Sequence, residues 1–244
     1  MQSSKLTYII WLSLGLIIFS RNASGQNFED LNFEQANIVR DPSDTNAVYV
    51  SEAIPGWTVS NSYHGTNEID YEVLSLGAPS VSLCGTEPAQ NGLNPAPPPL
   101  DGKFSIELYG GAPEMYPLLG ASISQTAMVP AHAESILFIA QQTLTGGPLL
   151  VSLGGQNISY SAISKGPDYT LYGGDIPAFA GQVETLTFNA PTGVNNYWEL
   201  DDIRFSSSPV PEPRTFSLCA LGGLFFTLGL RGESRMRQSQ INRQ

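Results

Sequence analysis

Residues Lys103–Tyr109 read KFSIELY, and their alternation of apolar and polar side chains decides the fold class. Successive side chains of an extended chain point to opposite faces, so Phe104, Ile106 and Leu108 would share one face. A helix would instead repeat apolar residues at roughly every three to four positions. Almost no stretch of the chain keeps that period. The pattern therefore predicts a β-strand with one buried face.

Short apolar runs of the same kind recur along the chain between Gly, Pro, Ser, Thr and Asn residues, which favour turns. The predicted strands are Phe33–Ile38, Trp57–Ser60, Ile69–Leu76, Ser80–Cys84, Phe104–Tyr109, Ala121–Met128, Ser135–Gln142, Leu149–Leu153, Gln156–Tyr160, Tyr169–Asp175, Val183–Asn189 and Trp198–Phe205. Such a series predicts an all-β fold, an antiparallel β-sandwich of the jelly-roll class.

Three local features refine this prediction. Gly154-Gly155 stands between two apolar runs and predicts a two-residue hairpin turn. The segment Asn94–Leu100 (NPAPPPL) cannot join a strand ladder because proline has no amide hydrogen, so we expect an exposed loop or an edge crossing. The alternation slips between Val183 and Leu186, which predicts a bulge or an early strand boundary.

The last predicted strand contains a change of parity. Leu200 is an odd number of residues from Ile203 and Phe205, so a regular strand cannot turn all three toward one core. An extra residue in the strand would restore the pattern, and the two aspartates between them, Asp201 and Asp202, are the natural place for it. We therefore expect a bulge there.

Residues 1–25 have the layout of a signal peptide, for which a helix is expected. Lys5 is the basic start, Leu6–Phe19 is an apolar run too short for a comfortable membrane span, and Ala23–Gly25 offers small residues to a signal peptidase. We expect cleavage before Gln26. A retained N-terminal anchor is the alternative.

Residues 210–237 combine a Pro-Glu-Pro tripeptide, an apolar helix expected over 215–230 and a cluster of arginines, followed by a polar tail at 238–244. Arginines beside a span resist translocation, so the tail would stay cytoplasmic. This arrangement resembles the PEP-CTERM sorting signal, through Pro211, Glu212, Pro213, Arg231, Arg235 and Arg237. The resemblance implies processing by an exosortase, membrane contact through the C-terminal helix before processing, and a host that makes exopolysaccharide. An ordinary tail-anchored protein is the alternative.

A folded segment at 26–205, joined to the sorting signal by a short tether at 206–209, is long enough for one sandwich domain. Between Gln26 and Pro209 the chain keeps 4 of its 11 Lys and Arg residues and 20 of its 22 Asp and Glu residues, a net charge near −16. Such a surface repels nucleic acid and anionic lipid. A divalent cation or a neutral glycan remains compatible with it.

The number and position of the cysteines limit which interactions can stabilise the folded segment. Cys84 is alone in the folded segment, because Cys219 lies in the apolar run near the C-terminus. No disulfide within the folded segment is expected, so stability must come from burial of apolar area, with or without a metal. We expect Cys84 to be a small buried apolar residue.

Several short segments within Phe33–Phe205 resemble galactose-binding-like jelly rolls, which include many carbohydrate-binding modules. These segments are Asn32–Glu34, Ile54–Val59, Ile123–Thr126 with Val129-Pro130, and Trp198–Ile203. The resemblance implies a structural Ca²⁺ held by Glu34 from the first strand and by Asp201 and Asp202 from the last, and no other cofactor is expected. Alternatively, the aspartates face solvent or pair with Arg204.

Glycan sites on such sandwiches combine an aromatic face with a few polar groups. We expect Tyr63 and Tyr116, which lie in loop-like sequence, and Trp57 as the candidate glycan contacts, although Trp57 also fits a core position. Neither His64 nor His132 stands in a catalytic motif. The sequence therefore predicts a protein without enzymatic activity.

The function expected from these features is that of an exported, surface-sorted protein that binds glycan or exopolysaccharide at the cell surface or in the extracellular matrix. Two alternatives remain open. One is a hydrolase or lyase that acts on polysaccharide through surface carboxylates, whose separation sequence alone does not give. The other is a purely structural matrix protein without a defined ligand.

Overall fold

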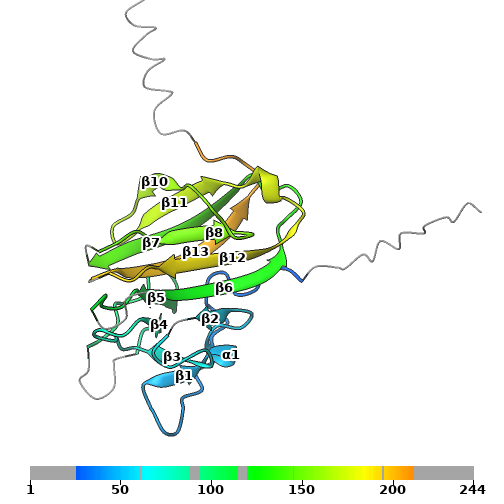
Figure 1. Ribbon diagram of the computed structural model, residues 1–244. Helices are drawn as coiled ribbons and strands as arrows, with labels where there is room; N and C mark the ends of the chain where they lie inside the picture. Colours follow the sequence, from blue (N-terminus) through cyan, green and yellow to red (C-terminus); the bar gives the residue numbers. More distant parts are fainter. Residues whose placement is uncertain are drawn as a thin grey trace, which may run out of the picture.

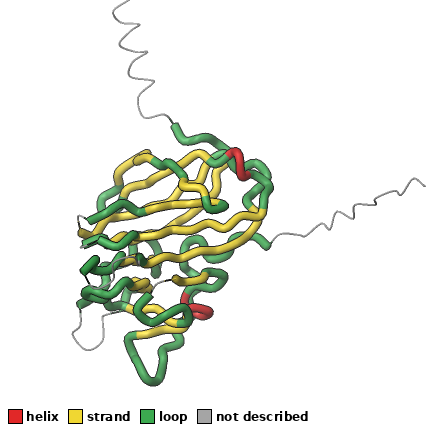
Figure 2. Tube along the Cα trace, in the orientation of Figure 1, coloured by secondary structure: helices red, strands yellow, loops and turns green. Residues whose placement is uncertain are grey.

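A computed structural model describes residues 26–60, 62–87, 94–114, 120–144, 146–193 and 195–211. In this part of the chain two β-sheets pack face to face, and Figure 1 shows the sheet with β6, β12 and β8 in front of the sheet with β7 and β13. Loops connect the strands, and Figure 2 shows them concentrated in the lower half of the view. The all-β sandwich predicted from the sequence is confirmed.

The larger sheet has eight strands, and the described pairs in it are antiparallel except for β3 and β4. Its order is β1 (Ala47–Tyr49), β3 (Glu68–Tyr71), β4 (Ser80–Cys84), β5 (Ser105–Tyr109), β13 (Tyr197–Ser206), β7 (Ser135–Leu144), β11 (Thr170–Asp175) and β10 (Ser161–Lys165). The smaller sheet has five strands, in the order β2 (Thr58–Ser60), β6 (Ala121–Met128), β12 (Val183–Ala190), β8 (Leu150–Leu153) and β9 (Gln156–Asn157). Within the described ranges two short helices, α1 (Val50–Ala53) and the 3-10 helix η2 (Pro177–Phe179), lie in connections.

Aromatic rings join the two sheets in the core. Phe138 of β7 meets Phe188 of β12 edge to face, with ring centroids 5.3 Å apart. Trp57 packs against both Phe188 and Phe33, with ring centroids 6.5 and 5.8 Å away. Burying side chains of this size supplies most of the driving force for such a fold.

The observed strands follow the predicted ones most closely at β4, which is buried at all five positions, and at β6, whose second half alternates in burial. The bounds of β4 and β6 agree with the prediction. The prediction of a strand at Phe33–Ile38 is wrong, because residues 31–35 form turns, residues 36–38 have no regular structure, and φ is positive at Phe33 and at the earlier Asp30. The carboxyl of Asp30 fixes the turn by accepting a hydrogen bond from the backbone N–H of Gln35.

Strands β1 and β10 and the short helices α1 and η2 were not predicted from the sequence. Strand β10 reads SAISK and is largely exposed, so it has no alternation that would distinguish it from a loop. It forms because the edge of β11 offers backbone partners.

The predicted bulge in the last strand is confirmed. The pairing of β13 with β7 shifts register between Asp201 and Arg204, and Asp202 takes a φ of 44°. As a result Leu200 and Ile203 are both buried and Phe205 packs against the same core.

The hairpin predicted at Gly154-Gly155 is confirmed as the turn between β8 and β9, and both glycines have positive φ. The irregularity predicted in Val183–Leu186 is wrong, since β12 pairs with β6 without a break. Val183 is 52% exposed and faces solvent at the strand start, so it does not need to follow the buried face.

The parallel pair β3–β4 requires a crossover connection. The crossover determines what covers the outer face of the large sheet, which is the face that points away from the small sheet. Segment 72–79 makes the crossover, and Ser82 Oγ donates a hydrogen bond to the backbone oxygen of Val73 within it. Pro95, at the start of the proline-rich segment, forms an isolated bridge with Val73. The side chains of β4, β5 and β13 that point away from the small sheet are therefore buried under these two segments.

Candidate functional site

A polar groove of about 380 Å³ opens beside the hairpin that joins β10 to β11. It is lined by Ala140, Gln141, Gln142, Lys165, Pro167, Asp168, Tyr169, Thr170 and Tyr172. Two of these residues are tyrosines and two are glutamines, so the groove combines aromatic rings with hydrogen-bonding amides. Such a combination suits a small neutral polar ligand.

The hairpin turn positions Tyr169. The backbone N–H of Gly166 donates to the backbone oxygen of Tyr169 over 2.8 Å, which closes the turn. A Cβ atom at position 166 would stand 2.9 Å from the Tyr169 ring, so the ring lies directly over the glycine. Any larger residue there would displace the ring.

The aromatic core positions Tyr172. Its ring stacks on Phe138 with centroids 5.6 Å apart and meets Tyr160 and Trp198 edge to face. Because three rings constrain it, Tyr172 presents a fixed wall to the groove. Rigid aromatic walls give contact area at little cost in conformational entropy.

The loop after β7 fixes the amide of Gln142. Its Nε2 donates to the backbone oxygen of Gly147 at 2.8 Å, and Trp198 Nε1 donates to the same oxygen at 3.0 Å. Gln141, in contrast, is exposed. One amide is therefore held in place and the other is free to meet a ligand.

Lys165 is the basic residue of the groove. Of the four basic residues between Gln26 and Pro209, Arg40 pairs with Glu87 and Arg204 pairs with Asp202. Lys165 forms no ion pair within the part of the chain that the structure describes, although Asp168 also lines the groove. Its ammonium group is thus available as a hydrogen-bond donor.

A second groove, of about 490 Å³, lies under the proline-rich segment and is mainly apolar. It is lined by Glu72, Gly85, Thr86, Glu87 and residues 95–99. The backbone N–H of Glu87 donates to Glu72 Oε1, and burial raises the pKa of the Glu72 carboxyl. With its polar group already engaged, this groove offers less to a polar ligand.

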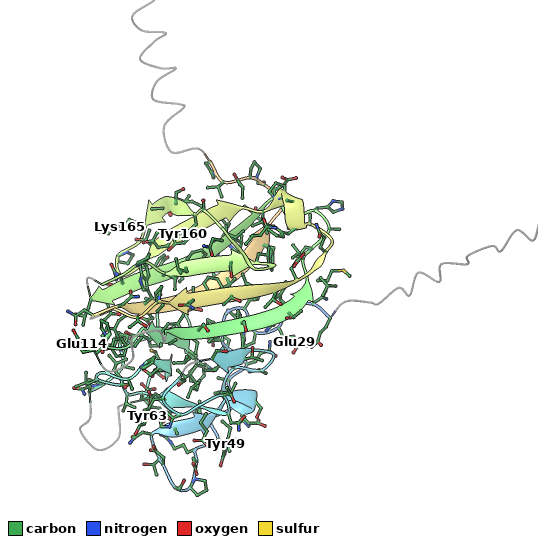
Figure 3. The ribbon with its side chains drawn as sticks, viewed as in Figure 1. Glu29, Tyr49, Tyr63, Glu114, Tyr160 and Lys165 are labelled. Atoms are coloured by element: carbon green, nitrogen blue, oxygen red, sulfur yellow. The ribbon has the colours of Figure 1, made fainter. Side chains whose placement is uncertain are left out.

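The aromatic residues expected to contact glycan lie elsewhere. Trp57 is 4% exposed, and its Nε1 donates to the backbone oxygen of Asp30. It is therefore a packing residue of the core, and the prediction that it contacts a glycan is wrong. Tyr63 is 67% exposed and lies at the opposite end of the molecule from Lys165 in Figure 3. Tyr116 is outside the described residues.

Glu34, expected to bind calcium, holds a loop in the structure. Its Oε1 accepts the backbone N–H groups of Lys103 and Phe104 at 2.6 and 3.1 Å. Gly102, with a φ of +60°, lies so close to this carboxyl that a Cβ there would overlap it. The carboxyl therefore ties the N-terminal turns to the entry of β5.

The two aspartates of the β13 bulge have separate partners. Asp201 Oδ2 accepts the backbone N–H of Asp101 at 3.1 Å, while its Oδ1 accepts that of Asp202. The carboxyl of Asp202 pairs with Arg204. Burial, followed by the charges of Asp101 and Asp202, raises the pKa of Asp201 to about 8 against the effect of those two hydrogen bonds.

Across the described ranges no group of three or more His, Cys, Asp or Glu residues could hold a metal ion. Glu34, Asp201 and Asp202 thus do not surround one point, and both carboxyl oxygens of Asp201 and Oδ2 of Asp202 are engaged within the chain. The residues do not fit a shared ion as they stand. Calcium bound by this set stays a prediction.

Two buried glutamates face each other on the large sheet, a feature that the sequence analysis did not anticipate. Glu107 of β5 and Glu199 of β13 are register partners, and each is 1% exposed. Burial raises the pKa of both carboxyls, and the charge of Glu199 raises that of Glu107 further. Alternation in KFSIELY places Glu107 on the polar face, but only the crossover shows that this face is covered.

The remaining predictions concern single residues. Cys84 is a free, fully buried thiol as expected, and burial raises its pKa well above the ordinary range. His64 Nε2 lies 2.9 Å from Asp70 Oδ1, and His132 is exposed. Neither histidine lines the polar groove.

The expected signal peptide at 1–25 and the sorting residues Glu212, Pro213, Arg231, Arg235 and Arg237 fall outside the described residues, whereas Pro211 is the last described one. None of the helices within the described ranges has the length and apolar character needed to cross a membrane.

Comparison with known proteins finds distant structural likeness alone. No protein-family model and no curated protein matches the chain. A cyclase from Fischerella sp. TAU in complex with 4-(1H-indol-3-yl)butan-2-one is 15% identical over 78% of this chain and 100% of that chain, with a TM-score of 0.41. The enzymatically active domain of bacteriophage CBA120 tailspike protein 4 is 12% identical over 72% of this chain and 21% of that chain, with a TM-score of 0.33. At these TM-scores the likeness carries no argument about activity.

Proposed function

We propose that this chain is an exported, non-enzymatic glycan-binding protein whose ligand is a neutral sugar unit of an extracellular polysaccharide. The observation that supports this function best is the polar groove, in which Tyr169 and Tyr172 stand beside Gln141, Gln142 and Lys165. Aromatic faces pack against the C–H surfaces of sugars, while amides and an ammonium group meet hydroxyls. Its volume, near 380 Å³, suits one or two sugar units.

The charge of the chain supports a neutral sugar over an acidic one. With a net charge near −16 between Gln26 and Pro209, the protein repels a polyanion at a distance. Lys165 is a single local cation beside Asp168, which is too little to offset that field. A neutral polysaccharide meets no such barrier.

The buried glutamates favour binding over hydrolysis. A glycosidase needs two carboxyl groups that flank the bond to be cut, in contact with substrate. Glu107 and Glu199 are acidic register partners on adjacent strands of the large sheet, but both are covered. The polar groove contains one acidic side chain, Asp168.

Surface sorting belongs to the same proposal. The tripeptide Pro211–Pro213 would be recognised by an exosortase after a signal peptidase has removed residues 1–25, and the protein would be held briefly in the inner membrane by the apolar segment at 215–230. It would then reach the cell surface or the extracellular matrix. No nucleic acid partner is part of this proposal, because the folded segment is strongly acidic.

A glycan array with the purified full-length chain tests the binding function. We expect binding to neutral glycans that the Tyr169→Ala variant loses and the Tyr63→Ala variant keeps. Tyr63→Ala is a matched control, since it removes another tyrosine ring from the opposite end of the molecule. Absence of binding to every glycan would overturn the function, and loss only in Tyr63→Ala would move the site to the residue expected from the sequence.

A further inference from the structure

A row of polar side chains crosses the outer face of the large sheet. Ser82 of β4, Glu107 of β5, Glu199 of β13 and Gln141 of β7 are consecutive register partners across four adjacent strands. Their neighbours in sequence, such as Ile106 and Leu200, belong to the core on the other face. The two glutamates are therefore side by side at the centre of the row.

The carboxyl group of Glu107 lacks a hydrogen-bond partner. Both of its oxygens are buried, and neither accepts a hydrogen bond from the described part of the chain. The hydroxyl of Thr143 lies beside it and lowers its pKa, but this Oγ1 also forms no hydrogen bond of ordinary geometry. Glu199 is only partly satisfied, because Ser105 Oγ donates to its Oε1. Buried polar groups without partners are uncommon in proteins, so this arrangement needs an explanation.

The cover over the row is close. Ser82 Oγ donates to the backbone oxygen of Val73, and the hydroxyl of Tyr197 donates to that of Ser75, so segment 72–79 is anchored directly above β4 and β13. Glu107 and Glu199 are each 1% exposed. A sugar or a peptide cannot reach them. A single ion can occupy such a position if it binds as the sheet forms.

The carboxylates expected to bind calcium differ from this pair in one respect. Glu34 accepts two backbone N–H groups, Asp201 accepts two more, and Asp202 pairs with Arg204. Glu107 accepts none. Two like charges held together in a buried place are costly unless a counter-charge accompanies them. The need for a cation is thus greatest at Glu107 and Glu199.

We propose that Glu107 and Glu199 bind one divalent cation, calcium, together with the hydroxyl oxygens of Ser105 and Thr143. All of these donors are hard oxygens, two carboxylates and two hydroxyls, which is the ligand chemistry of calcium. Magnesium keeps several of its waters when it binds to proteins, and a place that is 1% exposed suits an ion that can give them up. The ion would join β5 to β13 beneath the crossover.

The proposed calcium site is separate from the polar groove and would add a cofactor to the fold. The purified full-length chain is unfolded in urea with chelator, refolded in the presence of CaCl₂ and desalted, and its metal content is measured by mass spectrometry. We expect one calcium ion per chain in the wild type, none in Glu107→Gln or Glu199→Gln, and one in the exposed-glutamate control Glu134→Gln. Circular dichroism confirms that each variant is folded.

A second measurement uses the rings on the same face. Tyr109 lies two residues after Glu107, and Tyr197 lies two residues before Glu199. The two tyrosine rings stack with centroids 4.0 Å apart. Tb³⁺ bound at calcium sites luminesces when nearby aromatic rings are excited, so we expect luminescence in the wild type refolded with TbCl₃, and a weaker signal when excess CaCl₂ is present during refolding. This readout does not depend on whether either glutamine variant folds.

Three outcomes would overturn the proposal. If the wild-type protein retains no calcium and shows no Tb³⁺ luminescence, the two glutamates hold a proton and not a cation. Retention of calcium by Glu107→Gln and Glu199→Gln places the ion elsewhere. Loss of calcium in Glu34→Gln with retention in Glu107→Gln assigns it to the set expected from the sequence.

Discussion

The ring of Tyr169 lies over Gly166, where an added Cβ would come within 2.9 Å of it. This contact ties the shape of the polar groove to one glycine in the β10–β11 turn. Because the groove wall is a side chain supported by a backbone position, a change at Gly166 should alter binding more than folding.

Gly166→Ala tests this relationship. The new methyl group would push the Tyr169 ring away from the turn, so we expect affinity for the glycan found on the array to fall several-fold. The free energy of unfolding should change by less than about 1 kcal/mol, since the turn is at the surface. Isothermal titration measures the affinity, and urea unfolding measures the stability. Ser164→Ala, an exposed change on β10, is the control; equal affinity in Gly166→Ala would contradict the proposed wall.

The fold class could be predicted from local pattern because strands such as β2, β8 and β12 alternate between buried and more exposed side chains. The alternation in KFSIELY and the parity change at Leu200 and Ile203 were sufficient to predict a sandwich and a bulge. Strand β10 could not be found in this way, because it is an edge strand that only its pairing with β11 stabilises.

The groove and the buried pair depend on contacts between distant segments, which sequence patterns do not contain. Tyr169 and Gln142 lie 27 positions apart and meet only because β11 pairs with β7. Glu107 looks like a solvent-facing residue in its own strand, and the crossover at 72–79 is what covers it. Trp57, in contrast, was recognisable as a core residue from its own alternation with Val59.

Glu34→Ala should destabilise the fold whether or not calcium binds there. It removes the acceptor for the backbone N–H groups of Lys103 and Phe104. Loss of hydrogen bonds to a charged acceptor costs about 1.5–3 kcal/mol, so we expect a fall of that size in the free energy of unfolding. Urea unfolding in chelator provides the measurement. Glu134→Ala, whose carboxyl is exposed, should have almost no effect, and equal stability of the two variants would argue against this role.

Trp57→Phe should weaken the fold without changing glycan binding. The substitution removes the hydrogen bond from Nε1 to the backbone oxygen of Asp30 and leaves a small void beside Phe33 and Phe188. A loss of about 1–3 kcal/mol is expected in thermal or urea unfolding. Array binding identical to that of the wild type would agree with its core position. Selective loss of one glycan in a fully folded variant would restore Trp57 as a contact.

Glu212→Ala should block maturation if the tripeptide is a sorting signal. In a host with an exosortase, we expect unprocessed precursor to accumulate in the membrane fraction, detected by its larger mass on immunoblots. Glu233→Ala changes the other glutamate near the C-terminus and is the matched control. Normal processing of the Glu212→Ala chain would exclude recognition through this residue.

His64 should make stability fall as the pH rises through the neutral range. The hydrogen bond to Asp70 is the largest effect on the pKa of His64 and raises it above the ordinary value of 6.5, against the opposing effect of burial. A histidine whose pKa is higher in the folded state contributes stability that is complete below its unfolded pKa and is lost above its folded pKa. The difference in the free energy of unfolding between the wild type and His64→Gln should therefore shrink with increasing pH, as measured by urea unfolding across that range. His132→Gln, a change of an exposed histidine, should show no such trend, and a constant difference for His64→Gln would mean that the Asp70 contact does not depend on the proton.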